Sequence, residues 1–448
     1  MDTWDDLCTR LLHLLQDKTG QQGLFAIASF IIFGKIPNSQ DGTDLLPCGA
    51  SVVTLYLDAL NSLAMDKVLA LIDLADESLL LYPYKDVPRC WRRLLADAGL
   101  LRAMLLLRRW NGEITTARQL IHDLDIVMVV SGAPGLERRE IANQVLDTVQ
   151  DWLTTHRSKD DQQVVAETLT TKEKSAVEIT LERPVQRLQE CPSFFWFANH
   201  VCKATPVIIP HAIDHWPAMS SRPWQSARYL LDIAADRVVP VEIGRYTDAG
   251  WQQMMMRFED FVRIHVQNPQ TPPAYLAQHD LFRQIPRLEK DILVPDYCYV
   301  SPDYSEEEGE PPEEVIKNAW FGPRGTVSPL HHDPYHNLLA QVVGTKYLRL
   351  YSPGETDKLY PHEGLMSNTS QVDVGDPDLA RFPSFATADY VECVLQPGEL
   401  LYIPVSFISE TIEETKNTIY CVNSRNGGIM SSLSIQASAS VSGFSNKD

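Results

Sequence analysis

The chain lacks three features that would place it in common protein classes. Basic charge is in deficit: 39 lysine and arginine residues stand against 59 aspartate and glutamate residues, which gives a net charge of −20. A nucleic-acid-binding surface needs a basic patch, so we expect no direct nucleic-acid binding and a basic partner instead. The eight cysteines include no C-x-x-C pair, which excludes zinc-knuckle and thioredoxin-type sites.

A membrane-spanning run is also missing. A transmembrane helix needs about 20 apolar residues. The stretch GLFAIASFIIFG (23–34) has twelve residues, so it predicts a buried helix, with a membrane-associated segment as the alternative, and we expect no membrane partner. The start MDTWDDLC is acidic, unlike a signal peptide, and we therefore expect free thiols in a reducing compartment.

Residues 1–156 predict a helical N-terminal domain. Apolar residues recur at helical spacing in CWRRLLADAGLLRAMLLLRRW (90–110) and REIANQVLDTVQDWLTTH (139–156). No chemistry is visible in this region, so we expect a scaffold or a surface for protein partners. Residues 157–185 are polar and charged with few aromatics, which predicts a linker.

From residue 186 the pattern changes to short β-rich runs separated by proline and glycine. Strands are predicted at PVIIP (206–210), VVPVEI (238–243) and KYLRLYSP (346–353). The stretch YVECVLQPGELLYIPV (390–405) predicts a hairpin around its Pro-Gly turn, and WQQMMMRFEDFVRIHV (251–266) predicts a helix. We therefore expect an α+β protein whose helical domain precedes a jelly-roll domain over residues 186–405.

The segment SPLHHDPYHN (328–337) concentrates three histidines and one aspartate. If VSPLHHD is a strand, His331 and Asp333 share one face and His332 points away. An imidazole and a carboxylate so placed can take two adjacent positions on a metal, and a distant histidine would complete the facial triad of non-haem Fe(II) oxygenases. An isolated H-x-D also arises by chance, and a zinc-binding cupin or isomerase stays open. We expect His332 and His336 to be surface or hydrogen-bonded histidines.

Longer motifs around this segment carry a family resemblance. NAWFGPRGTVSPLHHDPYHNLLAQVVGTKYLRLYSP (318–353), YLAQHDLFRQIPRLEKDI (275–292) and NTSQVDVGDPDLARFP (368–383) resemble the JmjC-domain family of Fe(II)- and 2-oxoglutarate-dependent oxygenases. The resemblance runs from about residue 185 to residue 405. It implies a double-stranded β-helix fold and the use of Fe(II), 2-oxoglutarate and O₂. It also implies arginyl hydroxylation or N-methyl-lysine demethylation of basic proteins such as histone tails, in the nucleus and also the cytoplasm.

The resemblance further implies roles for single residues. His331 and Asp333 match two iron ligands, and Lys346 and Tyr275 match the partners of the distal 2-oxoglutarate carboxylate. Ser328 and Asn337 match further cosubstrate contacts. Asn337 is an even number of residues from His331, so on a continuous strand both side chains would face the same pocket. The substrate cleft, where an acid and aromatics suit a basic side chain, matches Glu242, Tyr246 and Trp320. Burial tendencies alone would place Lys346 at the surface and the aromatics Tyr275 and Trp320 in a core.

The chain departs from the family pattern where the third iron ligand is expected. The family places a distal histidine shortly after the strand PGELLYIP; the matching position here is Ser409, and no histidine follows His362. Substitutes would be Glu410, Glu413 or Cys421.

Residues 406–448, which end in the serine-rich MSSLSIQASASVSGFSNKD, predict an atypical tail without the family's closing strand, and hence an unpaired sheet edge. Two expectations follow: an oxygenase with weakened iron binding, or a pseudo-oxygenase that acts as a binding or regulatory module.

Overall fold

The structure is a computed structural model of the chain. It describes residues 6, 8–10, 45–83, 86–134, 136–157, 168–169, 179–245, 247–300, 315–405, 407–413 and 418–425, with side chains up to Glu410. The apolar stretch 23–34, the acidic run 305–314 and Tyr246 lie outside these residues. Within the described part of the chain, no helix combines the length and apolar character needed to cross a membrane.

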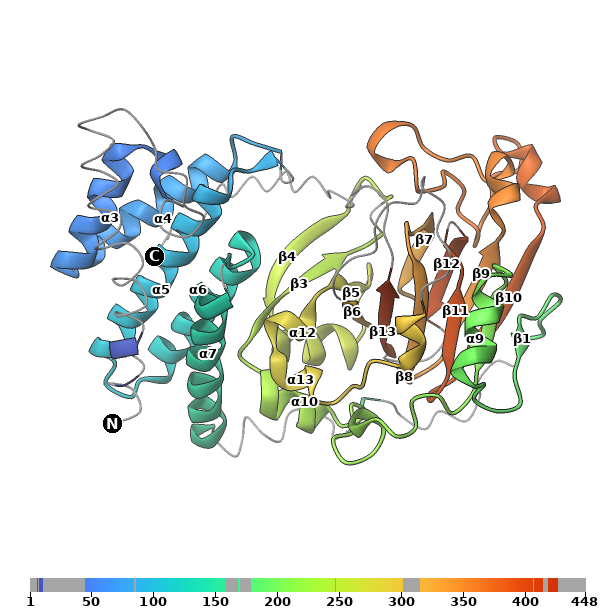
Figure 1. The fold of residues 1–448 in the computed structure, drawn as a ribbon, viewed down its shortest axis with the longest axis horizontal. Coiled ribbons are helices and arrows are strands. Elements are labelled where there is room, and N and C mark those ends of the chain that lie inside the picture. The colour runs from blue at the N-terminus through green and yellow to red at the C-terminus, as the bar shows by residue number, and fades with distance from the viewer. Residues whose placement is uncertain are drawn as a thin grey trace.

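The α-helices that the structure describes between residues 50 and 156 are drawn in blue and teal in Figure 1. They are α3 (Ala50–Ser62), α4 (Met65–Leu79), α5 (Arg89–Arg109), α6 (Ile114–Ser131) and α7 (Leu136–His156), and they confirm the helices predicted at 90–110 and 139–156. Helix α5 lies at the centre of their core, and a Cβ on its Gly99 would stand 2.5 Å from Val127 of α6. Glycine at this position therefore lets α5 and α6 approach closely.

Two β-sheets form the second part of the chain (Figure 1). The larger has nine strands in the order β1-β2-β11-β8-β13-β6-β5-β3-β4, and the smaller has four in the order β10-β9-β12-β7. The strands are β1 (Gln186–Arg187), β2 (Val207–Ile209), β3 (Val238–Ile243), β4 (Gln252–Arg257), β5 (Ala274–His279), β6 (Ile316–Gly322), β7 (Val327–His332), β8 (His336–Val343), β9 (Lys346–Tyr351), β10 (Tyr390–Leu395), β11 (Leu400–Ile403), β12 (Ile408–Glu413) and β13 (Thr418–Arg425). Together with the N-terminal helices, these sheets confirm the expected α+β jelly-roll fold.

Three apolar clusters show how the sheets are layered. Side chains between the two sheets include Leu339 of β8 and Leu348 and Leu350 of β9. The other face of the large sheet packs against helices that include α9 (Phe194–Val201), α10 (Ala227–Ala234), α11 (Phe258–Asp260), α12 (Leu281–Gln284) and α13 (Pro286–Glu289). The outer face of the small sheet is covered by the segment between β9 and β10. The inner faces of both sheets are therefore the protected place for a site.

The expectation that the chain lacks a closing strand is wrong. Strand β12 pairs with both β7 and β9, and β13 pairs with both β6 and β8, each time antiparallel. Each of these strands fills an interior position in its sheet, so neither sheet is left with the predicted open edge. The backbone pairing depends on partners far away in sequence, which local composition does not reveal.

Two local predictions are also corrected. The strands predicted as one hairpin over 390–405 belong to different sheets: β10 pairs with β9, whereas β11 pairs with β2 and β8. The Pro-Gly turn therefore carries the chain from the small sheet to the large one, with Gly398 at a φ of 95°. The helix predicted over 251–266 begins only at Phe258, because Gln252–Arg257 pairs with β3 as strand β4.

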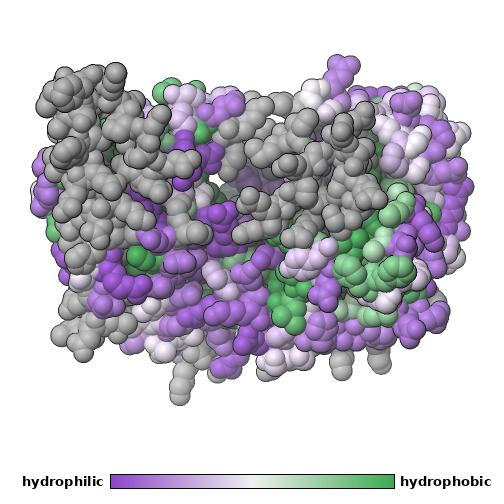
Figure 2. Space-filling view, viewed as in Figure 1, coloured by the Kyte–Doolittle hydropathy of each residue, from purple (hydrophilic) through white to green (hydrophobic). Residues whose placement is uncertain are grey.

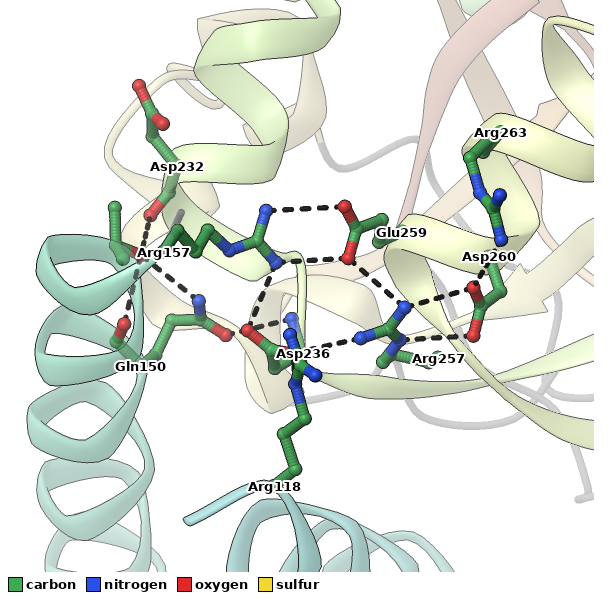
Figure 3. Close-up of polar contacts among 10 residues, drawn as sticks. Arg118, Gln150, Arg157, Asp232, Asp236, Arg257, Glu259, Asp260 and Arg263 are labelled. Atoms are coloured by element: carbon green, nitrogen blue, oxygen red, sulfur yellow. Dashed lines mark hydrogen bonds and ion pairs between the residues drawn. The ribbon is translucent and has the colours of Figure 1, made fainter. Parts of the chain in front are cut away.

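Buried ion pairs fix the helical region to the jelly roll (Figure 3). Asp236, between α10 and β3, is 2% exposed. Its carboxylate accepts hydrogen bonds from Arg118 of α6 at 2.9 Å, Arg157 at 3.1 Å and Arg257 at 3.2 Å. The backbone N–H of Asp236 donates to Gln150 of α7 at 3.0 Å. One carboxylate thus joins two helices to the start of the sheet region.

The visible face of the molecule is largely hydrophilic, with a hydrophobic patch over α9 (Figure 2). Phe194, Phe195 and Trp196 of this helix are exposed. Their neighbour Phe197 is buried and contacts Tyr297 and Tyr402, so α9 is held by one face only.

Substituting Asp236 by alanine should lower the free energy of unfolding by roughly 1–3 kcal/mol, because it removes a buried carboxylate that accepts hydrogen bonds from three partly exposed arginines. Urea denaturation measures the change. The control is Asp389→Asn, which breaks the exposed Arg183–Asp389 pair and should leave the curve unshifted. Equal, small effects of both substitutions would contradict the structural role of Asp236.

Candidate cosubstrate and metal site

Strand β7 carries the H-x-D motif and contains an irregularity that shapes the site. Pairing with β12 sets His331 opposite Ser409 and Ser328 opposite Thr411, with a register shift between these pairs. Two residues of β7 thus oppose one residue of β12, as in a β-bulge. By strict alternation Ser328 and His331 would face opposite ways; the bulge restores them to the same face.

The candidate residues gather on the inner faces of the two sheets. On the small sheet, Lys346 has the parity of Leu348 and Leu350, which lie in the core between the sheets. Ser409 pairs with Leu350 on one side and with His331 on the other, so these three residues share that face. On the large sheet, the residues that pack against the helices alternate along each strand with residues that face the small sheet. The inward-facing positions include Glu242, Tyr275, Trp320 and Asn337.

Hydrogen bonds orient the two predicted metal ligands. Nδ1 of His331 lies 2.7 Å from the carbonyl oxygen of Pro329. A ring that donates its Nδ1–H there keeps Nε2 as the metal-binding nitrogen. Asn337 of β8 donates to the Asp333 carboxylate at 2.9 Å. Strand β7 ends at His332, so Asn337 reaches the site from β8 of the large sheet and does not share a strand with His331, contrary to the prediction.

The other two histidines of the motif are placed away from this face. His332 is half-buried, and its backbone N–H donates to the carbonyl oxygen of Asn368 at 3.0 Å. Nδ1 of His336 lies 2.8 Å from the Tyr402 hydroxyl and accepts from the backbone N–H of Val405 at 3.2 Å. His336 is therefore hydrogen-bonded within the fold, which confirms the prediction of a hydrogen-bonded histidine at this position.

Lys346 and Tyr275 meet between the sheets. Lys346 is 0% exposed, and its Nζ donates to the Tyr275 hydroxyl at 3.3 Å. Burial tendency alone would have placed this lysine at the surface. Gly322 of β6 makes room for the pair, since a Cβ there would stand 2.6 Å from Cδ2 of Tyr275. A buried ammonium beside a phenol hydroxyl is a donor pair suited to a carboxylate.

Glu242 and Trp320 occupy the neighbouring part of the inner face. Glu242 pairs with Tyr275 across β3 and β5, and its side chain is 7% exposed. Burial raises the pKa of Glu242 to about 7, against a hydrogen bond from Trp251 at 3.3 Å that lowers it. Trp251 was not predicted as a site residue; a tryptophan beside the β3–β4 turn gave no sequence signal.

Comparison with known proteins adds the family. Residues 192–408 match the family of the cupin-like domain. Lysine-specific demethylase 8 of Danio rerio is 37% identical over 358 residues, which covers 78% of this chain and 85% of that protein. The Xenopus tropicalis protein of the same name is 49% identical over 221 residues, covering 48% and 47%. This chain belongs to the cupin-like JmjC family.

A more distant JmjC relative is named for a different activity. The human bifunctional peptidase and (3S)-lysyl hydroxylase is 28% identical over 260 residues, covering 51% of this chain and 80% of that protein. Relatives named for demethylation and for hydroxylation thus both match this part of the chain.

The JmjC iron site is incomplete among the residues that the structure describes. No group of three histidine, cysteine, aspartate or glutamate side chains is placed there to hold a metal. The position opposite His331 is Ser409, and a neutral serine hydroxyl is a poor substitute for the imidazole of a facial triad. The described donors therefore do not fit a three-ligand Fe(II) centre.

Of the substitutes named from the sequence, only Glu410 has a described side chain, and it is placed away from His331. Glu410 follows Ser409 on β12, so its side chain points to the opposite face, where it is buried near Asp373. Cys421 lies on β13 of the other sheet, opposite Ala319 and Ala340. The backbone of Glu413 pairs with Lys346, and its side chain lies outside the described residues.

Glu242 should make the stability of this JmjC domain depend on pH. Its pKa in the folded protein is about 7 and its ordinary value is 4.5. The raised pKa contributes stability that is present in acid and lost as pH rises from 4.5 to about 7. Glu242→Gln removes this dependence, so relative to the variant the parent should lose up to about 3 kcal/mol over that range.

Urea denaturation of both proteins at about pH 5 and about pH 8 measures the difference. Glu363→Gln, at an exposed position, is the control and should follow the parent at both pH values. If the gap between parent and Glu242→Gln is the same at both, the carboxyl group does not hold a proton in the folded state.

Proposed function

We propose that this chain, as its sequence stands, is a JmjC protein that binds 2-oxoglutarate and a basic protein segment without oxidising it. The observation that carries the proposal is the pairing of Ser409 with His331, at the position where a distal histidine would complete the iron site. Two protein ligands should bind Fe(II) more weakly than three. The protein would then act as a binding or regulatory module.

The 2-oxoglutarate pocket supports the binding part of this proposal. Lys346 and Tyr275 would hold the distal carboxylate through a charge-assisted hydrogen bond and a phenol hydroxyl. Ser328, restored to the inner face by the β-bulge, and Asn337, beside Asp333, would line the same cavity between the sheets.

The inner face near β3 supports a basic partner. Glu242 would pair with a lysine or arginine side chain. The positive charge of this partner would lower the pKa of the Glu242 carboxyl group and so favour its ionised form. Trp320 would supply an aromatic face for the same cation. The names of the relatives, which specify lysine, agree with this substrate class.

A second function, protein oxygenation, is supported by the relatives themselves. Identity of 37% over 358 residues extends through most of this chain, and its own His331 and Asp333 remain in place with oriented side chains. Under this reading the protein hydroxylates or demethylates basic side chains. It requires a third ligand from outside the described residues.

Lys346→Ala should weaken 2-oxoglutarate binding by about tenfold or more, because it removes a charge-assisted hydrogen bond. Isothermal titration calorimetry, without metal and with Mn(II), measures the affinity. The matched control is Lys358→Ala, at a lysine paired with Glu355 outside the pocket, which should bind like the parent. Equal affinities for the parent and Lys346→Ala would contradict the pocket assignment.

Succinate formation with Fe(II), 2-oxoglutarate and O₂ distinguishes the two functions. The non-catalytic proposal predicts no succinate from the parent and turnover by Ser409→His. Turnover by the parent that is abolished in His331→Ala would overturn that proposal and establish oxygenation.

A further inference from the structure

A buried carboxylate of the helical region reaches the sheet that carries the proposed site. Asp125 of α6 is 0% exposed. Its carboxylate accepts two hydrogen bonds from the Arg237 guanidinium, at 2.9 and 2.7 Å, and one from the backbone N–H of Val238 at 2.9 Å. Val238 is the first residue of β3, so a helix residue holds the beginning of a strand.

A fourth bond extends the contact to β5. Gln284 of α12 donates its side-chain amide to Asp125 at 3.0 Å and to the carbonyl oxygen of Val238 at 2.7 Å. The side-chain oxygen of Gln284 lies 2.6 Å from Nε2 of His279, which is the last residue of β5. Burial lowers the pKa of His279, so its neutral ring donates Nε2–H to that side-chain oxygen. Asp125, Gln284 and His279 thus form one chain of hydrogen bonds.

The strand register connects this tether with the site. Strands β3 and β5 are antiparallel, with Glu242 opposite Tyr275 and Ile243 opposite Ala274. The Gln284 side chain bonds both the Val238 carbonyl oxygen and the His279 ring, so these ends of β3 and β5 lie close together. The tether therefore joins the ends of the two strands that carry Glu242 and Tyr275, on the side nearest the helices.

We propose that Asp125 is a positioning residue: through Arg237, Val238 and Gln284 it fixes β3 against β5 and so holds Glu242 and Tyr275 in register for their ligands. The assignment of those ligands rests on the proposed function; the tether itself does not. The helical region is then part of the support of the site, in addition to any role as a partner surface.

Further charged and polar groups surround the Arg237 side of the tether. Arg237 is 0% exposed, and beyond Asp125 it faces Asp147 of α7, with Nη1 3.9 Å from that carboxylate. Its Nη2 also donates to the backbone carbonyl of Gln284 at 2.8 Å. A buried ion pair of this kind is costly to break, because the remaining charge is left without compensation.

Two variants separate positioning from general stability. Asp125→Asn keeps the shape and removes the charge. Gln284→Met cuts the link to β5 while leaving Arg237 paired with Asp125. The matched control is Asp97→Asn, because Asp97 is equally buried and its described partners Arg93, Arg138 and Tyr56 belong to the helical region.

Hydrogen–deuterium exchange of full-length protein without ligand is the first measurement. Both tether variants should exchange faster than Asp97→Asn over 238–243 and 274–279, including at Glu242 and Tyr275. A merely structural role would speed exchange near Val238 or throughout the molecule, and not selectively at those distant ends. Exchange at Glu242 and Tyr275 equal to that of Asp97→Asn would overturn the proposal.

The second measurement is the affinity for 2-oxoglutarate. Coupling through such a network predicts a roughly three- to thirtyfold loss in the tether variants and binding near the parental value in Asp97→Asn. If the parent itself binds no 2-oxoglutarate, the proposed function fails, and the selective exchange result still supports the tether. Parental affinity in folded tether variants would overturn the effect on the ligand site.

Discussion

The pairing of β12 with β7 and β9 is the constraint on which the rest of the site depends. It closes the small sheet, and it sets Ser409 directly opposite His331 on the inner face. Directly opposed residues of antiparallel strands have Cβ atoms about 4.5–5.5 Å apart, close enough for two side chains to share one metal. Under the proposed function, the identity of residue 409 would decide whether this site has three iron ligands or two, while the proposed 2-oxoglutarate anchors Lys346 and Tyr275 lie on β9 and β5.

A second constraint comes from outside the jelly roll. Asp125 and Asp236 are buried carboxylates with arginine partners, and their hydrogen bonds join α6 and α7 to the beginning of β3. Buried pairs of this type are costly to break, although they are weak evidence for net stability. Their value here is geometric: they define where β3 begins, and hence where Glu242 stands relative to Tyr275.

Local sequence pattern predicted those elements whose character is set by their own residues. The β-branched run VVPVEI became β3 with unchanged ends, and the long amphipathic or apolar runs became α5 and α7. Prediction failed where a distant partner decides. The strands around Gly398 join different sheets, Gln252–Arg257 is a strand because β3 pairs with it, and the segment after Val405 completes both sheets.

The site shows the same division. The H-x-D motif predicted the face of His331, whereas Asp333 lies beyond the end of β7. Resemblance to the JmjC family pointed to Lys346 and Tyr275, which are hydrogen-bonded although burial tendency would have separated them. The bulge in β7, the hydrogen bond from Asn337 and the Asp125 tether follow only from tertiary contacts.

The most direct test of the account is a double-mutant cycle at positions 331 and 409, in which the affinity for Co(II) is measured by visible absorption. The account predicts that Ser409→His raises Co(II) affinity by about tenfold or more in the parent and much less in a His331→Ala background. Equal gains in both backgrounds, or no gain in either, would contradict the placement of residue 409 beside His331.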